Sequence, residues 1–310
     1  MRNARAARPR EVQAQLQVQI LKALDLFVGQ LLADGRSPHT VGQYRRHVRA
    51  LAGWLEASSR SRDLRRLSHQ DIAAFFGSDT ARCTSSATTK KASSLNAMRT
   101  SIRCFLGYLH AAEHIPRNPA ALLKRARCSP PPPRAMRDDE ERKLLAYLAA
   151  VPGDVARRDE ALILLMLRAG LRIGAALGLD VEDLDLDRAE AHVRKDKNDR
   201  AETVLLSPDL VEHLRRFVGK RREGPLFAST DGERISTRHA QRRFTQAVLA
   251  AGIERKLSPH ACRHRFATRL LAKTGNLQLV RRAMRHRSIS STAIYAAVAE
   301  EDVRAALKAR

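Results

Sequence analysis

The sequence has 310 residues, more than a single hydrophobic core usually serves, so we expect two domains. Its 57 lysines and arginines outnumber its 33 aspartates and glutamates, and the net charge of +24 favours a polyanionic partner, nucleic acid first, over an acidic one. The longest uninterrupted apolar run, ALILLML at 161–167, is far shorter than the roughly 20 residues that span a bilayer, so we expect no membrane partner.

Residues 1–126 are expected to form a helical, nucleic-acid-binding domain. Apolar residues at three- and four-residue spacing run from 16 to 35, where Gly35 can end a helix. The pair Ser37-Pro38 can cap and start a second helix, whose apolar positions lie on one face and whose arginines lie on another. Two more helices are expected, from Ser68 to residue 77 and over 88–112.

Residues 127–134, RCSPPPPR, are expected to be a linker, because prolines remove backbone donors and favour extended geometry. A second domain, 135–310, then begins with the acidic helix start DDEERKLLAYLAAV and continues through an apolar helix over 157–170. The runs AEAHVR and AETVLLS, separated by the polar KDKNDR, predict a small hairpin, and the rest is expected to be helical. The predicted fold is mainly α with a small antiparallel β-sheet.

The stretch LSPHACRHRFATRL, 257–270, concentrates cationic side chains at a helix start. Ser258 can cap this helix and Pro259 suits its first position, where free backbone N–H groups favour an anion. His260, Arg263 and His264 share a helix face. A basic surface helix, or a zinc pair formed by the two histidines, has the same spacing. Zinc is disfavoured because no carboxylate accompanies them, and the four cysteines form no CxxC pair.

Three segments together carry a resemblance to a known family. AGLRIGAALGL at 169–179, LSPHACRHRFATRLL at 257–271 and MRHRSISSTAIYAAV at 284–298 resemble, in order and separation, the three signature boxes of the tyrosine recombinases, the phage-integrase and Xer family. The resemblance implies a helical, SAM-like core-binding domain followed by a catalytic domain. It implies site-specific cutting and rejoining of duplex DNA through a 3′-phosphotyrosyl intermediate, with no cofactor and no metal.

The resemblance also implies the catalytic residues. Tyr295 would be the nucleophile, and the phosphate-binding and proton-handling set would be Arg172, His260, Arg263 and His286. A hairpin lysine would protonate the leaving 5′-oxygen, and alignment on Arg200 indicates Lys195, with Lys197 as the alternative. This chemistry suits the residue types, because arginine forks match two phosphate oxygens and histidine exchanges protons near neutral pH.

Two positions depart from the family pattern. Ala175 stands where an acidic residue usually supports the first arginine, and its loss would slow catalysis unless Asp180 or Glu182 takes over that support. Arg285 replaces the glycine that commonly precedes the second histidine, which would disturb the turn if φ is positive there, or would add a phosphate contact.

The expected partner is double-stranded DNA with paired inverted half-sites, bound by a homo-tetramer that is a monomer or dimer when free. An accessory protein or a sister recombinase would be a further partner, and the location would be cytoplasmic, at the nucleoid. The residues expected to contact DNA outside the catalytic set are Arg45, Arg46, Arg49, Lys90, Lys91, Lys197, Arg242 and Arg243. Basic runs of this kind also occur as solvated helix faces.

The segment after Tyr295, AEEDVRAALKAR, is expected to dock on a neighbouring protomer, with folding back on its own domain as the alternative. Integration or excision, transposon movement and multimer resolution all remain open as roles. Two other activities fit the same residues. A type IB topoisomerase would relax DNA without recombining sites, and an integrase-derived regulator, suggested by Ala175, would bind DNA without forming an adduct.

Overall fold

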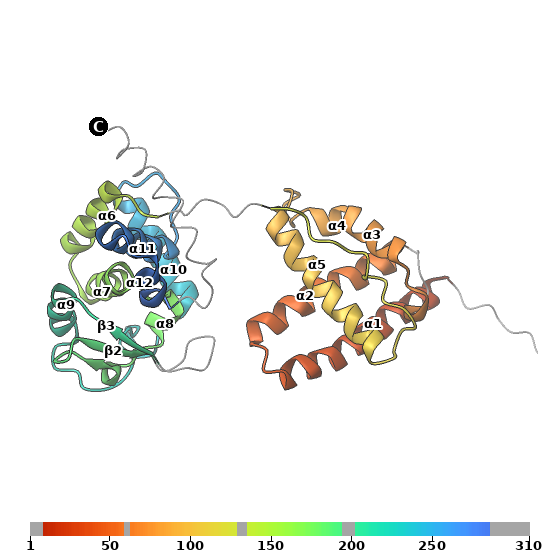
Figure 1. The fold of residues 1–310 in the computed structure, drawn as a ribbon, viewed down its shortest axis with the longest axis horizontal. Helices are drawn as coiled ribbons and strands as arrows, with labels where there is room; N and C mark the ends of the chain where they lie inside the picture. Colours follow the sequence, from red (N-terminus) through yellow and green to blue (C-terminus); the bar gives the residue numbers. More distant parts are fainter. Residues whose placement is uncertain (1–8, 59–62, 129–134, 194–201, 286–310) are drawn as a thin grey trace, which may run out of the picture. The chain divides into compact units, whose positions relative to one another are not determined.

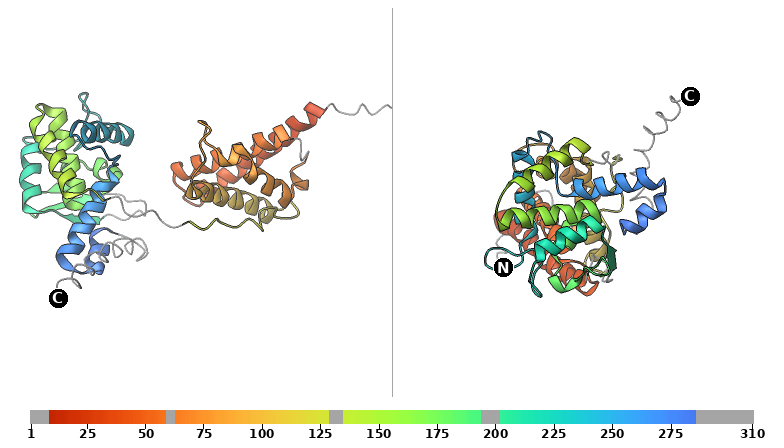
Figure 2. Two further views of the ribbon diagram at one scale, coloured as in Figure 1. Left: turned by 90° about the horizontal axis from the view of Figure 1, so that it is seen from above. Right: turned by 90° about the vertical axis from the view of Figure 1, so that its left-hand side faces the viewer.

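The computed structural model describes residues 9–58, 63–128, 135–193 and 202–285, and for 9–15 it describes the backbone alone. The chain divides into two compact units, Met1–Pro130 and Pro131–Arg310. Both are mainly helical, and the second contains a small antiparallel sheet (Figures 1 and 2). The predicted fold class is confirmed.

The first unit is a helical bundle around one apolar core. Helix α1 packs against α2 and α5, and the ring of Phe27 lies 5.6 Å from Tyr44, 5.6 Å from Phe105 and 5.3 Å from Tyr108 between ring centroids. The predicted cap at Ser68 is present as a capping box, because the Ser68 Oγ accepts from the Asp71 N–H and the Asp71 carboxylate accepts from the Ser68 N–H. The elements are α1 Pro9–Ala33, α2 Pro38–Ser58, the 3-10 helix η1 Leu64–Arg66, α3 His69–Gly77, α4 Asp79–Arg82 and α5 Ala92–Ala111.

One stretch of α1, Leu16–Ala33, is long and apolar enough to cross a membrane by length and composition. The uninterrupted apolar runs within this stretch are short, because isolated polar residues break them, and the sequence therefore did not indicate it. Its buried side chains, among them Leu16, Ile20 and Leu24, belong to the core shared with α2 and α5. We therefore interpret α1 as a core helix of this unit.

The second unit is built around α7, an apolar helix that packs against α6, α8, α9, α10 and α11. The predicted hairpin is present as β2 and β3, paired antiparallel from Glu190↔Leu205 to Val193↔Glu202, and an unpredicted third strand, β1, pairs with the other edge of β2. The sheet lies at one end of the unit beside α9 (Figure 1). The elements are α6 Asp138–Ala150, α7 Asp154–Ala169, α8 Ile173–Leu177, η2 Val181–Asp183, β1 Leu184–Asp185, β2 Glu190–Val193, β3 Glu202–Leu205, α9 Pro208–Val218, α10 Thr237–Ala250, α11 His260–Thr274 and α12 Leu277–Ala283.

Gly170 ends α7 in the left-handed conformation, with φ 63°, two residues before Arg172. A Cβ at Gly170 would lie 2.4 Å from Cδ1 of Phe266. We predict that Gly170→Ala lowers the free energy of unfolding by about 1–3 kcal/mol, because the new methyl group adds a clash to an unfavourable φ. Thermal unfolding followed by circular dichroism measures the loss. Gly174→Ala is the matched control, since Gly174 has open space around it within α8 and should be neutral or slightly stabilising. Equal effects of the two substitutions would contradict the prediction.

His47 joins α2 to α5 through a 2.8 Å contact between its Nδ1 and the Ser101 Oγ. The Ser101 hydroxyl gives its proton to the Ala97 carbonyl, so the His47 Nδ1–H is the donor. Burial, followed by the positive charges of Arg46 and Lys90, lowers the pKa of His47 from 6.5 to about 4. The neutral imidazole is therefore the form that this packing selects.

Because the folded-state pKa of His47 is depressed, its contribution to stability is complete above pH 6.5 and is lost as the pH falls toward about 4. We predict that the urea midpoint of the first unit falls over this range and that His47→Gln flattens the dependence. Fluorescence of Trp54, the single tryptophan, which packs edge-on against Phe75 at 5.7 Å, reports this unit. An equally steep pH dependence in His47→Gln would refute the assignment.

Candidate active site

Arg172 lies immediately after the turn that ends α7. It occupies the N-cap position of α8 with φ −70° and ψ 145°, and its side chain is half-buried. The carbonyl of Arg172 accepts from the N–H of Ala176 at 2.9 Å, which starts α8. The short turn from Gly170 to Ile173 thus fixes the backbone of Arg172 between two helices.

Helix α11 presents the second cluster of predicted site residues. It begins at His260, and its N-cap is Pro259, at φ −52° and with no side-chain cap hydrogen bond, so the cap predicted at Ser258 is wrong. The His260 and His264 rings meet edge to face, with centroids 4.4 Å apart, as the i and i+4 spacing predicts. The three residues predicted to share this face differ in burial: His260 is exposed, His264 is half-buried and Arg263 is 1% exposed.

Among the described site residues, Arg263 has the most deeply enclosed charge. Its Nη1 donates to the carbonyl of Gly170 and its Nη2 donates to the carbonyl of Met284. One side chain therefore connects the end of α7 to α11 and to the residue two positions before His286. Gly170, Arg263 and Met284 each belong to a different one of the three motif segments, so Arg263 joins these segments. A charged donor thus compensates the burial of these two carbonyls.

His260 is close enough to Arg263 and Arg172 for their charges to act on it. Desolvation by the surrounding chain, and then the positive charges of Arg263 and Arg172, hold the pKa of His260 below its usual value. His260 is still exposed at the surface. Its partial burial and the nearby arginine charges therefore act together to favour the neutral form. A neutral imidazole beside two guanidinium groups is able to accept a proton while they bind an anion.

The acidic first turn of α6 binds arginines of α11 and of the segment before α11. Glu141, 4% exposed, accepts from Arg265 at 2.8 Å and from Arg269 at 2.7 Å, and the carboxylate of Glu140 accepts from Arg255 Nε at 2.8 Å. The sequence predicted only a favourable dipole for this acidic turn. The signal that was overlooked is the i and i+4 spacing of Arg265 and Arg269, which places both on one side of α11, where both reach Glu141 of α6.

The two departures from the family pattern now have structural descriptions. Ala175 is half-buried and packs against the core of the second unit. Asp180 forms an ion pair with Arg234, and Glu182 is exposed. Arg285 has φ 51°, so the positive φ considered at this position is present. Its Nε lies 3.3 Å from Oε2 of Glu202.

The basic residues predicted to contact DNA differ in their surroundings. Arg46, Arg49, Lys91 and Arg242 are exposed, and Arg45 is half-buried. Three have hydrogen-bond partners within the protein, one of them through the 3.4 Å contact between Arg242 Nη2 and His239 Nδ1. Lys90 donates to the carbonyls of Thr80 and Ala81 at 3.2 and 2.9 Å, and Arg243 donates to the buried carboxylate of Asp159 at 2.7 Å. DNA contact by these two would compete with internal bonds. Lys195, Lys197, His286 and Tyr295 lie outside the described residues.

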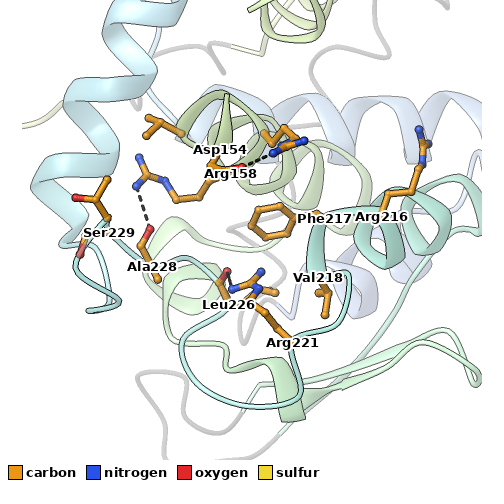
Figure 3. A pocket seen from close by; sticks show the side chains of 12 residues that line it. Asp154, Arg158, Arg216, Phe217, Val218, Arg221, Leu226, Ala228 and Ser229 are labelled. Atoms are coloured by element: carbon orange, nitrogen blue, oxygen red, sulfur yellow. Dashed lines mark hydrogen bonds and ion pairs between the residues drawn. The ribbon is translucent and has the colours of Figure 1, made fainter. Parts of the chain in front are cut away.

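A cavity of about 590 Å³ lies at the other end of α7 (Figure 3). It is lined by the first turns of α7, the end of α9 and the loop that follows α9, with arginines on several sides. At 1.5 Å per residue, α7 places its first turn about 20 Å from Arg172. Arg158 and Arg221 already donate to main-chain carbonyls, of Ala228 and of Pro225 and Leu226, so the cavity belongs to the packing of α7 and not to the motif site.

Within the described part of the chain, no group of three or more histidine, cysteine, aspartate or glutamate side chains is placed to hold a metal ion. His260 and His264 thus find no third protein ligand among the described residues. The described part of the motif site combines two arginines with the neutral imidazole of His260, which is an arrangement for binding an anion and moving a proton.

Both units match family models. Residues 134–302 match the phage integrase family, and residues 24–113 match the phage integrase N-terminal SAM-like domain. Tyrosine recombinase XerC of Escherichia coli O127:H6 is 32% identical over 209 residues, which are 66% of this chain and 69% of that protein. Tyrosine recombinase XerC of Yersinia pestis is 29% identical over 209 residues, 66% of this chain and 68% of that protein.

Solved recombinase structures have the same fold. XerH site-specific recombinase bound to a palindromic difH substrate, a post-cleavage complex, superimposes with a TM-score of 0.72 at 19% identity, over 96% of this chain and 92% of that one. A lambda integrase dimer bound to a COC′ core site gives 0.68 at 20% identity, over 88% and 76%. The chain belongs to the phage integrase family, the tyrosine recombinases, which are enzymes of site-specific DNA recombination. The family and the enzyme class expected from the three motif segments are confirmed.

We predict that Arg172→Ala and Arg263→Ala have different effects on stability. Arg263→Ala should lower the free energy of unfolding on the order of 2–4 kcal/mol, because it leaves two buried carbonyls without their charged donor. Arg172→Ala, at a half-buried position, should cost less than about 1 kcal/mol. Urea unfolding followed by circular dichroism compares them. A loss as large for Arg172→Ala as for Arg263→Ala would contradict the structural role given to Arg263.

Proposed function

We propose that this protein cuts and rejoins duplex DNA at specific sites, with Tyr295 as the nucleophile that becomes linked to a 3′-phosphate. The observation that carries the proposal is the convergence of Arg172, His260 and Arg263 from segments about 90 residues apart in the sequence. The family membership of both units and the net charge of +24 support a DNA substrate.

In the first step the Tyr295 Oη attacks the scissile phosphorus, and the bond from phosphorus to the 5′-oxygen breaks. Arg172 and Arg263 stabilise the charge that grows on the non-bridging oxygens, which is the kind of interaction that typically changes rates by about 10²- to 10³-fold. A guanidinium has five N–H groups, so the two carbonyl bonds of Arg263 are compatible with a phosphate contact. Arg172 is the more accessible of the two.

The protons move through histidine and lysine. Neutral His260 accepts the phenolic proton of Tyr295, which its lowered pKa favours at neutral pH. His286 donates a hydrogen bond to a phosphate oxygen. Lys195, or Lys197 in its place, protonates the leaving 5′-oxygen. Attack by a 5′-hydroxyl of a second strand on the phosphotyrosine then reverses these roles and completes the strand exchange.

The proposed assembly is a homo-tetramer on paired inverted half-sites, monomeric or dimeric when free, with an accessory protein or sister recombinase as a further partner and the nucleoid as the location. The related XerH and lambda integrase structures were solved with DNA, which supports duplex DNA as the substrate of this chain. The exposed Arg46, Arg49, Lys91 and Arg242 are the first candidates for backbone contacts.

A second candidate function is sequence-specific DNA binding without cleavage. Ala175 favours it, because the acidic support that the family pattern places there is replaced by a methyl group that packs in the core. The two functions differ in whether bound DNA becomes covalently attached.

We predict a covalent protein–DNA band when the protein is incubated with nicked suicide duplexes, made from the DNA that flanks its gene, in the presence of EDTA. The band should form in EDTA, because the arginines supply the charge neutralisation that Mg²⁺ provides in metal-dependent nucleases. Tyr295→Phe should bind the same duplexes and give no band. Tyr147→Phe is the matched control, since Tyr147 packs against the core of the second unit, and it should keep the band.

Tight binding of the wild-type protein with no band on a denaturing gel would favour the non-cleaving function. A band that persists in Tyr295→Phe would show that another residue is the nucleophile. Relaxation of supercoiled plasmids that lack the flanking DNA would favour topoisomerase activity.

A further inference from the structure

The ion pair between Arg285 and Glu202 joins two parts of the chain that the sequence keeps 83 positions apart. The Arg285 side chain is 10% exposed and that of Glu202 is 35% exposed, but the two contacting atoms, Arg285 Nε and Glu202 Oε2, are both buried. Loss of Glu202 would leave the charge of Arg285 with little solvent, so this pair should hold its geometry more firmly than a pair that is fully exposed.

Each partner lies beside a segment of the proposed active site. Glu202 is the first residue of β3 and pairs in register with Val193, the last residue of β2. It therefore stands at the base of the hairpin whose connecting residues, 194–201, include Lys195 and Lys197. Arg285 directly precedes His286 and follows Met284, whose carbonyl accepts from Arg263.

The backbone at Arg285 adopts a conformation that L residues disfavour. Its φ of 51° lies in the left-handed region, which costs an L residue roughly 1–2 kcal/mol. Glycine would adopt this turn without that cost. The arginine side chain, directed at Glu202 and shielded from solvent, provides an interaction that glycine lacks. Because the charge of Arg285 already has a carboxylate partner, its main role is not expected to be a phosphate contact.

We propose that Arg285 is a positioning residue, whose ion pair with Glu202 holds the base of the β2–β3 hairpin against the segment that leads to His286 and so aligns the hairpin lysine with the leaving 5′-oxygen. This inference rests on the proposed function. Arg285 itself contacts neither the DNA nor the reacting atoms in this account. It acts through the lysine, and its removal should therefore impair the step in which the leaving oxygen is protonated.

The test compares single-turnover cleavage of two substrates at saturating protein. One has the ordinary 5′-oxygen, and the other has a 5′-phosphorothiolate, whose sulfur leaves without a proton. Arg285→Gly removes the ion pair and relieves the backbone, while Glu202→Gln removes one charge and keeps the shape of the side chain. Arg282→Ala is the matched control, because Arg282 is exposed on α12 and has the same charge three positions away.

We expect Arg285→Gly and Glu202→Gln to cleave the ordinary substrate about ten- to a hundredfold more slowly than wild type, a part of what general acid catalysis contributes. On the phosphorothiolate both should come within about twofold of wild type. The double variant should be no slower than the slower single variant, because the two changes break one interaction. Lys195→Ala and Lys197→Ala in the same assay identify the general acid, since only its loss is rescued.

Unchanged cleavage by both variants, or a loss that the phosphorothiolate does not restore, would overturn the positioning role while leaving the proposed function intact. A wild-type protein that cleaves neither substrate would overturn the proposed function and this inference with it. Melting temperatures of the variants separate misfolding from misalignment. Glu202→Gln, which preserves side-chain shape at a partly exposed position, keeps the test decisive if Arg285→Gly does not fold.

Discussion

The enclosed guanidinium of Arg263 is the interaction on which the arrangement of this site depends. A charge this deeply buried is tolerated only where polar partners replace its water, and here the partners are the carbonyls of Gly170 and Met284. Those carbonyls belong to the turn before Arg172 and to the approach to His286. The residue that the family resemblance assigns to phosphate binding therefore also holds the motif segments together, and the chemistry of the site is inseparable from its folding.

Arginine is used for structure in much of the second unit. Arg158 and Arg243 share the carboxylate of Asp159, Arg234 pairs with Asp180, and Arg265 and Arg269 converge on Glu141. The net charge of +24 predicted a polyanionic partner correctly as a class, but a basic composition overstates how many cations face that partner. Planar guanidinium groups suit both roles, because they bind carboxylates and carbonyls as readily as phosphates.

Local signals in the sequence predicted the elements well and their distant contacts poorly. The capping box at Ser68, the end of α7 at Gly170 and the β2–β3 hairpin follow from short-range rules of capping, φ and alternation. Strand β1, only two residues long, has no periodicity to detect. For the site, the motif segments indicated Arg172, His260 and Arg263, whose catalytic roles stay predictions. The spacing of Arg265 and Arg269 indicates that they share a helix face. That their partner is Glu141, and that Arg285 pairs with Glu202, depends on tertiary packing, which spacing along the chain does not encode.

The most direct test of the account is to locate the covalent bond. Digestion of the trapped protein–DNA complex with trypsin, followed by mass spectrometry, should find the nucleotide adduct on the peptide over 288–304, in which Tyr295 is the single tyrosine. An adduct there would show that Tyr295 is the nucleophile whose reaction Arg172, His260 and Arg263 are proposed to assist. An adduct on a peptide that contains Tyr44, Tyr108 or Tyr147, or on a histidine, would contradict the assignment of the active site.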